Sequence, residues 1–482
     1  MAQMAHHDEI ELKFDLDARA ARKVRRHRLL AETDRRKWIQ RTVYFDTCNG
    51  KLRKKGYSLR VRQIGDRFTQ TVKTSGRSAG LFNREEWESP VRRMHPELSA
   101  LEKTPLARLK NFDRLEPIAQ FDVDRTSWTI EIDGAAIEVV LDSGRLRAGP
   151  RKAPLHELEI ELKNGDAHAI FAVAQELSHA APMEIGVLSK EERGFLLARN
   201  ALGRGQKASA LDIRRKMDVR QAFEMCVREC VRHFRLNEQA IIVGRDPEAV
   251  HQARVAMRRL RTAFSFFRPA IRQGEFARLR QKLRDFTLLF GKARNIDVFL
   301  ARHRQELRST DRKRLSVARD EAYAGVIAAM GTQQTRGLFL ELVEWAASDD
   351  WVRGCADGPI EAFAGKQLDK IWKKLKRKGS KLPDLEEGEL HRLRITTKKL
   401  RYALEFVAAL YSKKRTRKFT KTLEKIQNCL GQLHDDMTAR QLIEEFSLDF
   451  RAKVERTDQT RRLKAAEAHF KRLKGEDRPW SR

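Results

Sequence analysis

Cysteine is scarce in this chain of 482 residues, which contains five, and no two of them form a CxxC pair. Such an odd and scattered set excludes a disulfide framework and a zinc-finger pattern. Long apolar runs are also missing, since none reaches the roughly 18 residues that a membrane-spanning helix needs. Residues 1–8 contain no apolar signal segment. These absences predict a cytoplasmic protein without a membrane span.

The chain also has fewer negative than positive side chains, and the excess of positive charge is unevenly distributed along it. Residues 1–200 hold 36 Lys and Arg against 30 Asp and Glu, a net charge of +6. Residues 201–482 hold 63 against 37, a net charge of +26. The positive field of the second half favours a polyanionic partner. Nucleic acid, inorganic polyphosphate and an anionic membrane all satisfy this requirement.

The local pattern changes at about residue 207. Before it, turn signals separate short alternating segments that predict strands. These segments are 9–14, 41–45, 57–63, 67–73, 84–88, 127–132, 136–142 and 156–163. After it, apolar residues recur at spacings of three and four, which indicates helices. We therefore expect a strand-rich domain over 6–203, a linker over 204–211 and a helical domain over 212–475.

Several predicted strands alternate charged and apolar residues, and their charges are sorted by sign. Glu9 and Glu11 share one face of their strand, and Arg60 and Arg62 share one face of another. A half-buried sheet with solvated charges is the simplest interpretation of one such strand. If the sheet closes, however, both signs meet inside, where an unpaired charge costs several kcal/mol. A bound polyanion and a divalent metal with oxygen ligands would offset that cost.

The motif Glu9-x-Glu11-x-Lys13 resembles the signature of the CYTH superfamily, the triphosphate tunnel metalloenzymes. Other elements follow in the family's order: Tyr44-Phe45-Asp46-Thr47, Arg60-x-Arg62, Thr71-Val72-Lys73, Arg84 with Glu86 and Glu88, Arg125, Asp142-x-Gly144, Glu157-x-Glu159-x-Glu161 and Leu188-Ser189-Lys190-x-x-Arg193-Gly194. The resemblance covers about residues 6–200. It implies an eight-stranded antiparallel β tunnel that binds triphosphates with a divalent metal.

The resemblance also implies roles for individual residues. The metal, Mg²⁺ or Mn²⁺, would be held by Glu9, Glu11, Asp142, Glu157, Glu159 and Glu161. The sequence leaves open whether Glu157 or Glu161 is the partner of Glu159. The triphosphate would be held by Lys13, Arg60, Arg62, Lys73, Arg84, Arg125 and Lys190. The catalytic set would be Glu9, Glu11, Lys13 and Asp142.

Members of this family act on different triphosphates. Inorganic triphosphate fits best, because no base-recognition feature is evident in residues 1–200 and the domain is joined to a basic helical one. RNA triphosphatase, thiamine triphosphatase and adenylate cyclase activities are the alternatives within the family. A binding protein with an inactive tunnel is the alternative outside catalysis, although the intact Glu9, Glu11 and Lys13 set opposes it.

The second half contains an internal repeat with an offset of 140 residues. His251-x-x-Arg254-x-x-x-Arg258-Arg259-Leu260-Arg261 aligns with His391-x-x-Arg394-x-x-x-Lys398-Lys399-Leu400-Arg401. Leu289-x-Gly291-x-x-Arg294-Asn295 aligns with Cys429-x-Gly431-x-x-His434-Asp435 at the same offset. The repeats span about 215–350 and 355–475. Each copy places its basic side chains on one helical face, where like charges repel, so a ligand that offsets this cost is expected.

These two elements resemble the marks of the CHAD domain, an α-helical domain named for its conserved histidine, over about residues 212–470. The resemblance implies a duplicated all-α bundle that binds inorganic polyphosphate. The α+β tunnel domain would thus precede an all-α domain, which would deliver substrate or anchor the protein at polyphosphate granules. Nucleic acid is a secondary candidate, because the basic stripes lack the aromatic ladder of single-strand binders. The implied ligand set is His251, Arg254, Arg258, Arg259, Arg261, Arg294, His391, Arg394, Lys398, Lys399 and Arg401.

Overall fold

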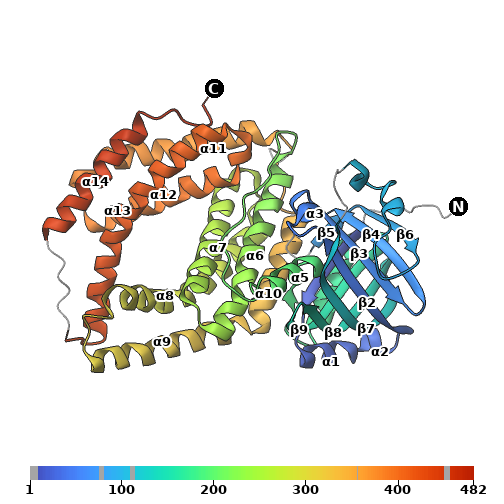
Figure 1. Cartoon of the computed structure of the whole chain (residues 1–482). Helices are drawn as coiled ribbons and strands as arrows, with labels where there is room; N and C mark the ends of the chain where they lie inside the picture. The colour runs from blue at the N-terminus through green and yellow to red at the C-terminus, as the bar shows by residue number, and fades with distance from the viewer. Residues whose placement is uncertain (1–8, 75–80, 109–113, 355–356, 450–455, 482) are drawn as a thin grey trace. The chain divides into compact units, whose positions relative to one another are not determined.

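A computed structural model describes residues 9–74, 81–108, 114–354, 357–449 and 456–481, and it divides into two compact units. Unit 1 comprises Met1–Arg204 and Gly331–Glu344, and unit 2 comprises Gly205–Met330 and Trp345–Arg482. Unit 1 is built on a β-sheet, whereas unit 2 is helical (Figure 1). The α+β fold class expected from the sequence is confirmed.

The sheet of unit 1 contains ten antiparallel strands within the described residues, where the sequence predicts eight. All eight predicted segments lie in strands, but the one over 84–88 is divided at Glu85, and a two-residue strand is added. The strands are β1 (Glu9–Asp15), β2 (Arg35–Asp46), β3 (Tyr57–Ile64), β4 (Arg67–Thr74), β5 (Leu81–Arg84), β6 (Glu86–Val91), β7 (Glu116–Ile132), β8 (Ala135–Ala148), β9 (Arg151–Asn164) and β10 (Glu184–Ile185).

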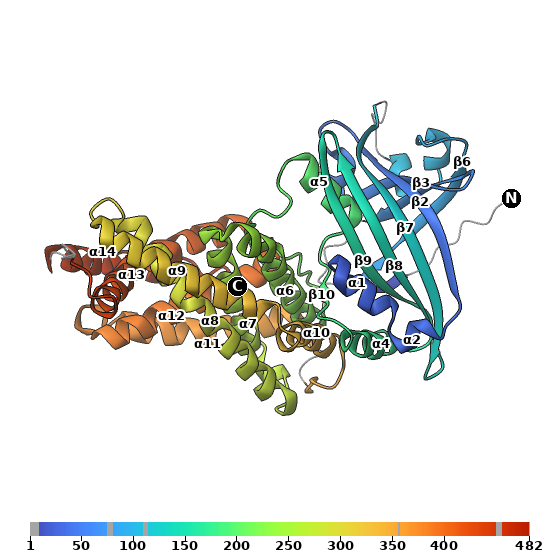
Figure 2. The same ribbon diagram turned by 90° about the horizontal axis from the view of Figure 1, so that it is seen from below.

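The sheet closes on itself through β5 and β6. Strand β6 pairs with β4, and β5 pairs with β1 near the opposite end of the strand order. Because Glu85 alone separates β5 from β6, this segment joins the two sides of the sheet. Strands β7, β8 and β9 lie side by side and form one wall (Figure 2). The interior of the closed sheet is called the tunnel below.

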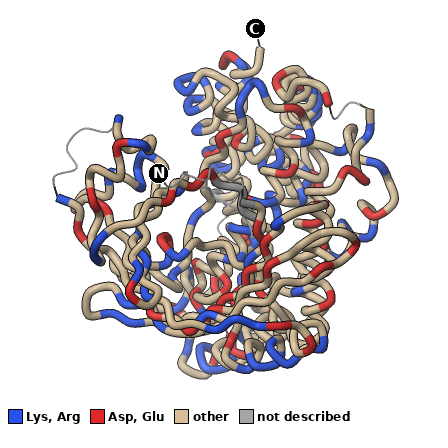
Figure 3. Tube along the Cα trace, turned by 90° about the vertical axis from the view of Figure 1, so that its right-hand side faces the viewer, with Lys and Arg blue, Asp and Glu red and all other residues tan. Residues whose placement is uncertain are grey.

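The two faces of the sheet differ in polarity. On β3 and β4, Leu59, Val61 and Val72 belong to an apolar cluster on the outer face, which also receives side chains from η1 (Leu98–Leu101) and η2 (Pro105–Arg108). Alternate residues on these strands therefore point into the tunnel. Charges of both signs occur along the strands of unit 1 (Figure 3). The tunnel thus receives the charged half of the alternating pattern.

Within the described residues before Arg204, the helices that accompany the sheet are α1 (Ala18–Arg25), α2 (Arg28–Ala31), α3 (Lys51–Lys54), α4 (Ala169–Ser178) and α5 (Lys190–Ala198). Helix α5 packs on the inward face of the sheet, where its Leu197 joins an apolar cluster with Phe121 and Leu146. A Cβ atom on Gly194 would lie 2.4 Å from the Cβ of Ala119, so a glycine is needed for this approach. The apolar end of α5 therefore fills part of the tunnel, and its first residue, Lys190, faces the charged part.

Unit 2 contains two sets of four helices that follow the sequence repeat. The first set is α6 (Val219–Gly244), α7 (Pro247–Phe266), α8 (Gly274–His303) and α9 (Ser309–Met330). The second set is α11 (Ile360–Gly379), α12 (Glu387–Phe406), α13 (Lys413–Glu445) and α14 (Arg456–Lys474). Helix α10 (Gln333–Ala347) separates the sets in sequence, and η4 (Leu382–Asp384) precedes α12.

The offset of 140 residues holds for the helices as well as for the motifs. Helix α7 and the short η3 (Arg268–Ala270) correspond residue for residue to α12 and η5 (Ala408–Leu410). Corresponding helices contact each other, since α6 packs on α11, α7 on α12 and α8 on α13. The basic stripes on α7 and α12 therefore belong to two helices in direct contact.

Candidate functional sites

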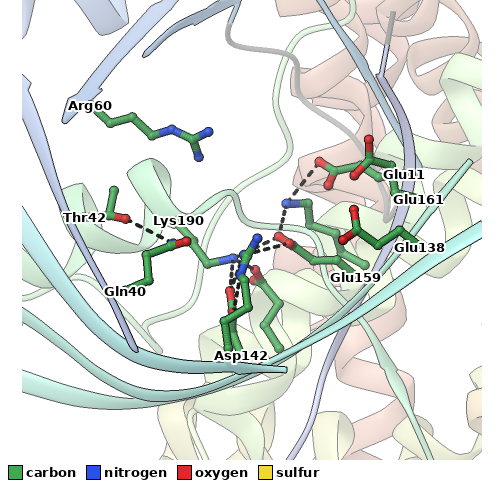
Figure 4. Close-up of polar contacts among 12 residues, drawn as sticks. Glu11, Gln40, Thr42, Arg60, Glu138, Asp142, Glu159, Glu161 and Lys190 are labelled. Atoms are coloured by element: carbon green, nitrogen blue, oxygen red, sulfur yellow. Dashed lines mark hydrogen bonds and ion pairs between the residues drawn. The ribbon is translucent and has the colours of Figure 1, made fainter. Parts of the chain in front are cut away.

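Carboxylates from three neighbouring strands line one wall of the tunnel. The strand register places Glu11 of β1 opposite Glu161 of β9, and Glu161 opposite Glu138 of β8. These side chains lie across the tunnel from Arg60 (Figure 4). Lys163 contacts the outer pair, at 3.0 Å from Glu138 and 2.7 Å from Glu161. Glu138 is absent from the residues predicted from the sequence, because its place depends on the β8–β9 register.

A second group of carboxylates lies deeper, around the Lys190 ammonium group. Asp142, Glu157 and Glu159 have carboxylate oxygens within 4.8 Å of one another, and all three side chains are buried. The Lys190 Nζ lies 3.0 Å from Asp142 and 2.9 Å from Glu159, and it also bonds Glu157. Burial alone would lower the pKa of Lys190, but the three carboxylates raise it well above its ordinary value. Lys190 is therefore charged and central to the group.

Two further cations complete this network. The Lys13 Nζ lies 2.6 Å from Glu159 and 3.0 Å from Glu11, so it links the two groups of carboxylates. Arg125 donates two hydrogen bonds to Asp142, at 2.7 and 2.6 Å, and reaches Glu159 at 3.1 Å. Although burial opposes the charge on Glu159, the cations Lys13, Lys190 and Arg125 lower its pKa well below the ordinary value. The same balance lowers the pKa of Asp142.

Glu157 behaves differently from its neighbours. It is fully buried, and burial raises its pKa despite the attraction of Lys190 and Lys13. The register pairs it with Asp15, away from Glu11, whereas Glu161 faces Glu11 directly. On this geometry Glu161 shares the open wall with Glu11, and Glu157 belongs to the deep network.

The opposite wall of the tunnel is cationic. Arg60 lies 3.1 Å from Glu86, and the Lys73 Nζ lies 2.6 Å from the same carboxylate. Arg62, in contrast, forms no salt bridge with any residue that the structure describes, and its Nε is buried without a hydrogen-bond partner. Burial, with Arg60 and Arg125 nearby, lowers the pKa of Arg62 to about 10. This wall holds more positive charge than its own glutamates neutralise.

Two sequence-predicted residues cannot be placed at the side-chain level. Glu9 and Arg84 lie opposite each other in the β1–β5 pairing, but their side chains fall outside the described part of the structure. The other predicted tunnel residues, from Lys13 to Lys190, come together on the inward face. The sequence predicts no role for Arg193, which belongs to the same motif as Lys190. In the structure Arg193 donates a hydrogen bond to Asp15 and so anchors α5 to β1.

The carboxylates of the tunnel fit a divalent metal in their chemistry. Mg²⁺ and Mn²⁺ prefer hard oxygen ligands, and the wall offers them from Glu11, Glu138 and Glu161 next to Glu159. The trio of Asp142, Glu157 and Glu159 supplies oxygens at short mutual distances, but Lys190 already balances it. The open wall therefore suits an added cation better than the deep network does.

In unit 2, the two basic stripes meet where α7 and α12 pack together; this surface is called the basic groove. Its half-buried members on the first helix are His251, Arg254 and Arg258. Burial, followed by the charges of Arg294, Arg258 and Lys398, lowers the pKa of His251 to about 3. Because Lys398 belongs to α12, the two copies face each other closely enough to perturb one another.

The second copy shows the same crowding of positive charge. Burial, with Arg258 and Arg394 nearby, lowers the pKa of Lys398 to about 6. The ring centroids of His391 and His434 lie 4.8 Å apart and the ring planes are tilted by 46°, so His434 contacts the predicted histidine. Burial and Arg394 lower the pKa of His434 to about 4. These groups lose charge in the free protein and would regain it beside an anion.

Two predicted members of the stripes contact side chains outside the stripes. Arg259 is buried, 2% exposed, and its guanidinium lies 5.4 Å from the ring centroid of Phe406 in the helical core. Arg401 forms a salt bridge of 2.6 Å with Glu405. The H-x-x-R spacing selects one helical face, but Arg259 follows Arg258 directly and points elsewhere.

We found no helix in the described part of the chain with the length and apolarity to cross a membrane.

Comparisons with known proteins match both units. Residues 7–195 match the family model of the CYTH domain, and residues 225–444 match that of the CHAD domain. The inorganic triphosphatase of Haemophilus influenzae is 33% identical over 158 residues, which are 32% of this chain and 45% of that protein. The chain therefore spans less than half of the length of this relative.

Solved structures resemble each unit. The CHAD domain of the plant Ricinus communis is 28% identical, with a TM-score of 0.46, and the match covers 56% of this chain and 89% of that domain. HpAC1 from Hippeastrum, described as having a dominant triphosphatase activity, is 20% identical, with a TM-score of 0.31, over 40% of this chain and 95% of that protein. From the two family matches, this chain carries a CYTH domain followed by a CHAD domain.

Proposed function

We propose that unit 1 hydrolyses inorganic triphosphate to pyrophosphate and phosphate with the help of Mg²⁺ or Mn²⁺. The observation that carries this proposal is the opposition of a cationic wall, with Arg60 and Arg62, to a carboxylate wall, with Glu11 and Glu161. A linear triphosphate needs cations along its oxygens and a metal at the reacting phosphate. The inorganic triphosphatase among the relatives supports this choice of substrate.

Each wall has a distinct task in this mechanism. Arg60, Arg62 and Lys73 would bind the phosphate oxygens and stabilise the charge that develops on the leaving pyrophosphate. Glu11, Glu159 and Glu161 would hold the metal, together with Glu9 from the same strand as Glu11. When bound, the metal neutralises phosphate charge and lowers the pKa of water. Lys13 and Arg125 would position Glu159 between the walls.

Phosphate release from a panel of substrates tests this proposal. We expect the purified chain to hydrolyse inorganic triphosphate with Mg²⁺ or Mn²⁺ and to lose this activity in excess chelator. ATP, thiamine triphosphate and RNA with a 5′-triphosphate should react more slowly, because the described tunnel residues include no dedicated base-binding feature. Faster release from one of these substrates, or cyclic AMP formation from ATP, would assign the tunnel another triphosphate reaction. No turnover of any substrate by the folded protein would contradict catalysis.

We infer that unit 2 binds inorganic polyphosphate in the basic groove. The supporting observation is the crowding of His251, Arg254, Arg258 and Lys398 from two helices in contact. Burial, followed by the charges of Arg258 and Arg394, lowers the pKa of Lys398 to about 6. A dense polyanion without bases satisfies these cations without aromatic stacking partners. The match to the CHAD family model supports the same ligand.

Polyphosphate binding should strengthen as the pH falls. Lys398, with its pKa of about 6, is largely neutral at pH 8 in the free protein, and a bound polyanion raises its pKa, so binding takes up a proton. We expect the affinity to increase by up to about tenfold per pH unit between pH 8 and pH 6. Isothermal titration at several pH values measures this slope.

The Lys398→Met variant should bind polyphosphate more weakly, and its affinity should change less with pH than that of the wild type.

A competition experiment tests the choice of ligand. Labelled RNA serves as the competitor, and polyphosphate should displace it far better than RNA displaces polyphosphate. A preference for RNA would move the proposal to a nucleic-acid ligand. An affinity for polyphosphate that does not change with pH in the wild type would contradict the role of Lys398.

A further inference from the structure

Unit 2 has a second cationic hollow, outside the basic groove. It lies where α7 ends, η3 follows and α8 begins, and its volume is about 440 Å³. Four arginines and two glutamines line it: Arg261, Arg268, Arg280, Arg284, Gln273 and Gln281. Of these, Arg261 alone belongs to the motif that the sequence analysis singled out. The hollow is called the arginine pocket below.

The positive charge of the arginine pocket is not neutralised by its neighbours. Within the described residues, none of its four arginines forms a salt bridge. Two acids on α8 have other partners: Glu275 pairs with Arg278, and Asp285 accepts a hydrogen bond of 2.8 Å from Gln281, which lines the pocket. Arg268 donates to the carbonyl of Ile271 at 2.8 Å. Burial, with Arg284 and Arg280 nearby, lowers the pKa of Arg261.

The second copy of the repeat shows what the fold itself requires at this place. At the offset of 140, Arg261 corresponds to Arg401 and Arg284 corresponds to Glu424. In that copy Arg401 lies 2.6 Å from Glu405 and 3.8 Å from Glu424, so its charge is balanced. Arg280 likewise corresponds to Thr420. The corresponding helices of the second copy thus pack with a threonine and a glutamate where the first copy has Arg280 and Arg284.

The arginine pocket begins about one helical turn from the basic groove, because Arg258 and Arg261 are three residues apart on α7. Arg258 of the groove is close enough to Arg261 to lower its pKa, and it also acts on Lys398. On the other side, Lys399 of α12 is half-buried, and this burial, with Lys374 and Arg280 nearby, lowers its pKa. Arg258 and Lys399 therefore place positive charge between the groove and the pocket.

We propose that the arginine pocket is a second phosphate-binding subsite, which holds the continuation of a long polyphosphate chain whose first part lies in the basic groove. One guanidinium group can donate two parallel hydrogen bonds to phosphate oxygens. Four such groups around one hollow therefore match a segment of a polyanion. Nucleic acid is less suited, because Phe276, the aromatic residue in the hollow, is 6% exposed and lies beneath Arg268. This inference rests on the proposed polyphosphate binding of unit 2.

The test transplants two residues of the second copy into the first. Arg280→Thr with Arg284→Glu reproduces Thr420 and Glu424, which the same packing already tolerates. The control is Arg312→Thr with Lys313→Glu, an exposed pair on α9 whose replacement changes the charge equally. Both full-length variants and the wild type are titrated with short-chain and long-chain inorganic polyphosphate at several salt concentrations, and circular dichroism checks their folding.

We expect the transplanted variant to bind long chains at least about tenfold more weakly, because two charge-assisted contacts are lost. The slope of log affinity against log salt should decrease by about two. Its affinity for short chains, which the groove alone can hold, should match that of the control. The subsite would be overturned by an equal loss of affinity for short and long polyphosphate chains, by no loss of affinity, or by a loss of affinity for RNA alone. Wild-type protein that binds neither length would instead refute the proposed function of unit 2, and the subsite with it.

Discussion

Replacing Glu11 by glutamine is expected to lower kcat/KM for inorganic triphosphate about a hundredfold or more. Glu11 is 4% exposed, lies opposite Glu161 and is 3.0 Å from Lys13, so the change removes a negative charge from the wall proposed to hold the metal. Glutamine keeps the shape of the side chain, and the loss should therefore reflect charge. A metal contribution of about 3 kcal/mol to the transition state corresponds to this factor.

The metal dependence separates this role from a purely structural one. If Glu11 holds the metal, the variant should need a higher concentration of Mg²⁺ or Mn²⁺ for half of its maximal rate. Glu102→Gln, at an exposed residue on the outer side of unit 1, is the control and should keep wild-type kinetics. A folded Glu11→Gln variant with full activity and an unchanged metal requirement would rule out the proposed role.

Replacing Lys190 by methionine is expected to destabilise unit 1 by about 3–5 kcal/mol, because it leaves a group of buried carboxylates without their central cation. Lys190 is 8% exposed, with Asp142 and Glu159 at 3.0 and 2.9 Å. Lys163→Met is a matched control, since Lys163 also contacts two glutamates but its side chain is 44% exposed. The control should cost less than about 1 kcal/mol. Urea unfolding of both variants measures the difference.

The stability that the Lys190→Met variant loses should depend on pH. The cations lower the folded-state pKa values of Asp142 and Glu159, so their ion pairs contribute stability above the unfolded pKa values and lose it as the pH falls. Without Lys190 these carboxylates are easier to protonate in the folded state. The difference in the free energy of unfolding between the wild type and the variant should therefore be smaller at pH 5 than at pH 8. A deficit that is small at both values would mean that Lys190 is not the centre of the network.

The strands and the helical repeat could be predicted from the sequence because both depend on local periodicity. The alternation in Glu9-x-Glu11-x-Lys13 identifies a strand with one charged face. Register is not local, however, so the sequence could not tell that Glu138 adjoins Glu161 or that Glu157 lies deep in the network. The division of one predicted strand at Glu85 depends in the same way on the closure of the sheet.

The basic residues of unit 2 show a similar limit. The spacing of His251, Arg254 and Arg258 identifies one helical face, but it does not show that Arg259 turns into the core beside Phe406. The arginine pocket was missed because Arg280 and Arg284 lie outside the repeated motifs. Comparing the two copies position by position would have found it, since Glu424 replaces Arg284 in the second copy.

The closure of the sheet has a consequence for synthesis on the ribosome. Lys13 and Glu159, which bond to each other, are 146 positions apart, so β1 is made long before β9 can pair with it. At roughly 5–20 residues per second, this delay is on the order of ten seconds. Meanwhile Ile10, Leu12 and Phe14 form an uncovered apolar row. Charged side chains between them, including Glu11, oppose edge-to-edge association. The residues proposed to bind the metal would thus also protect the nascent strand.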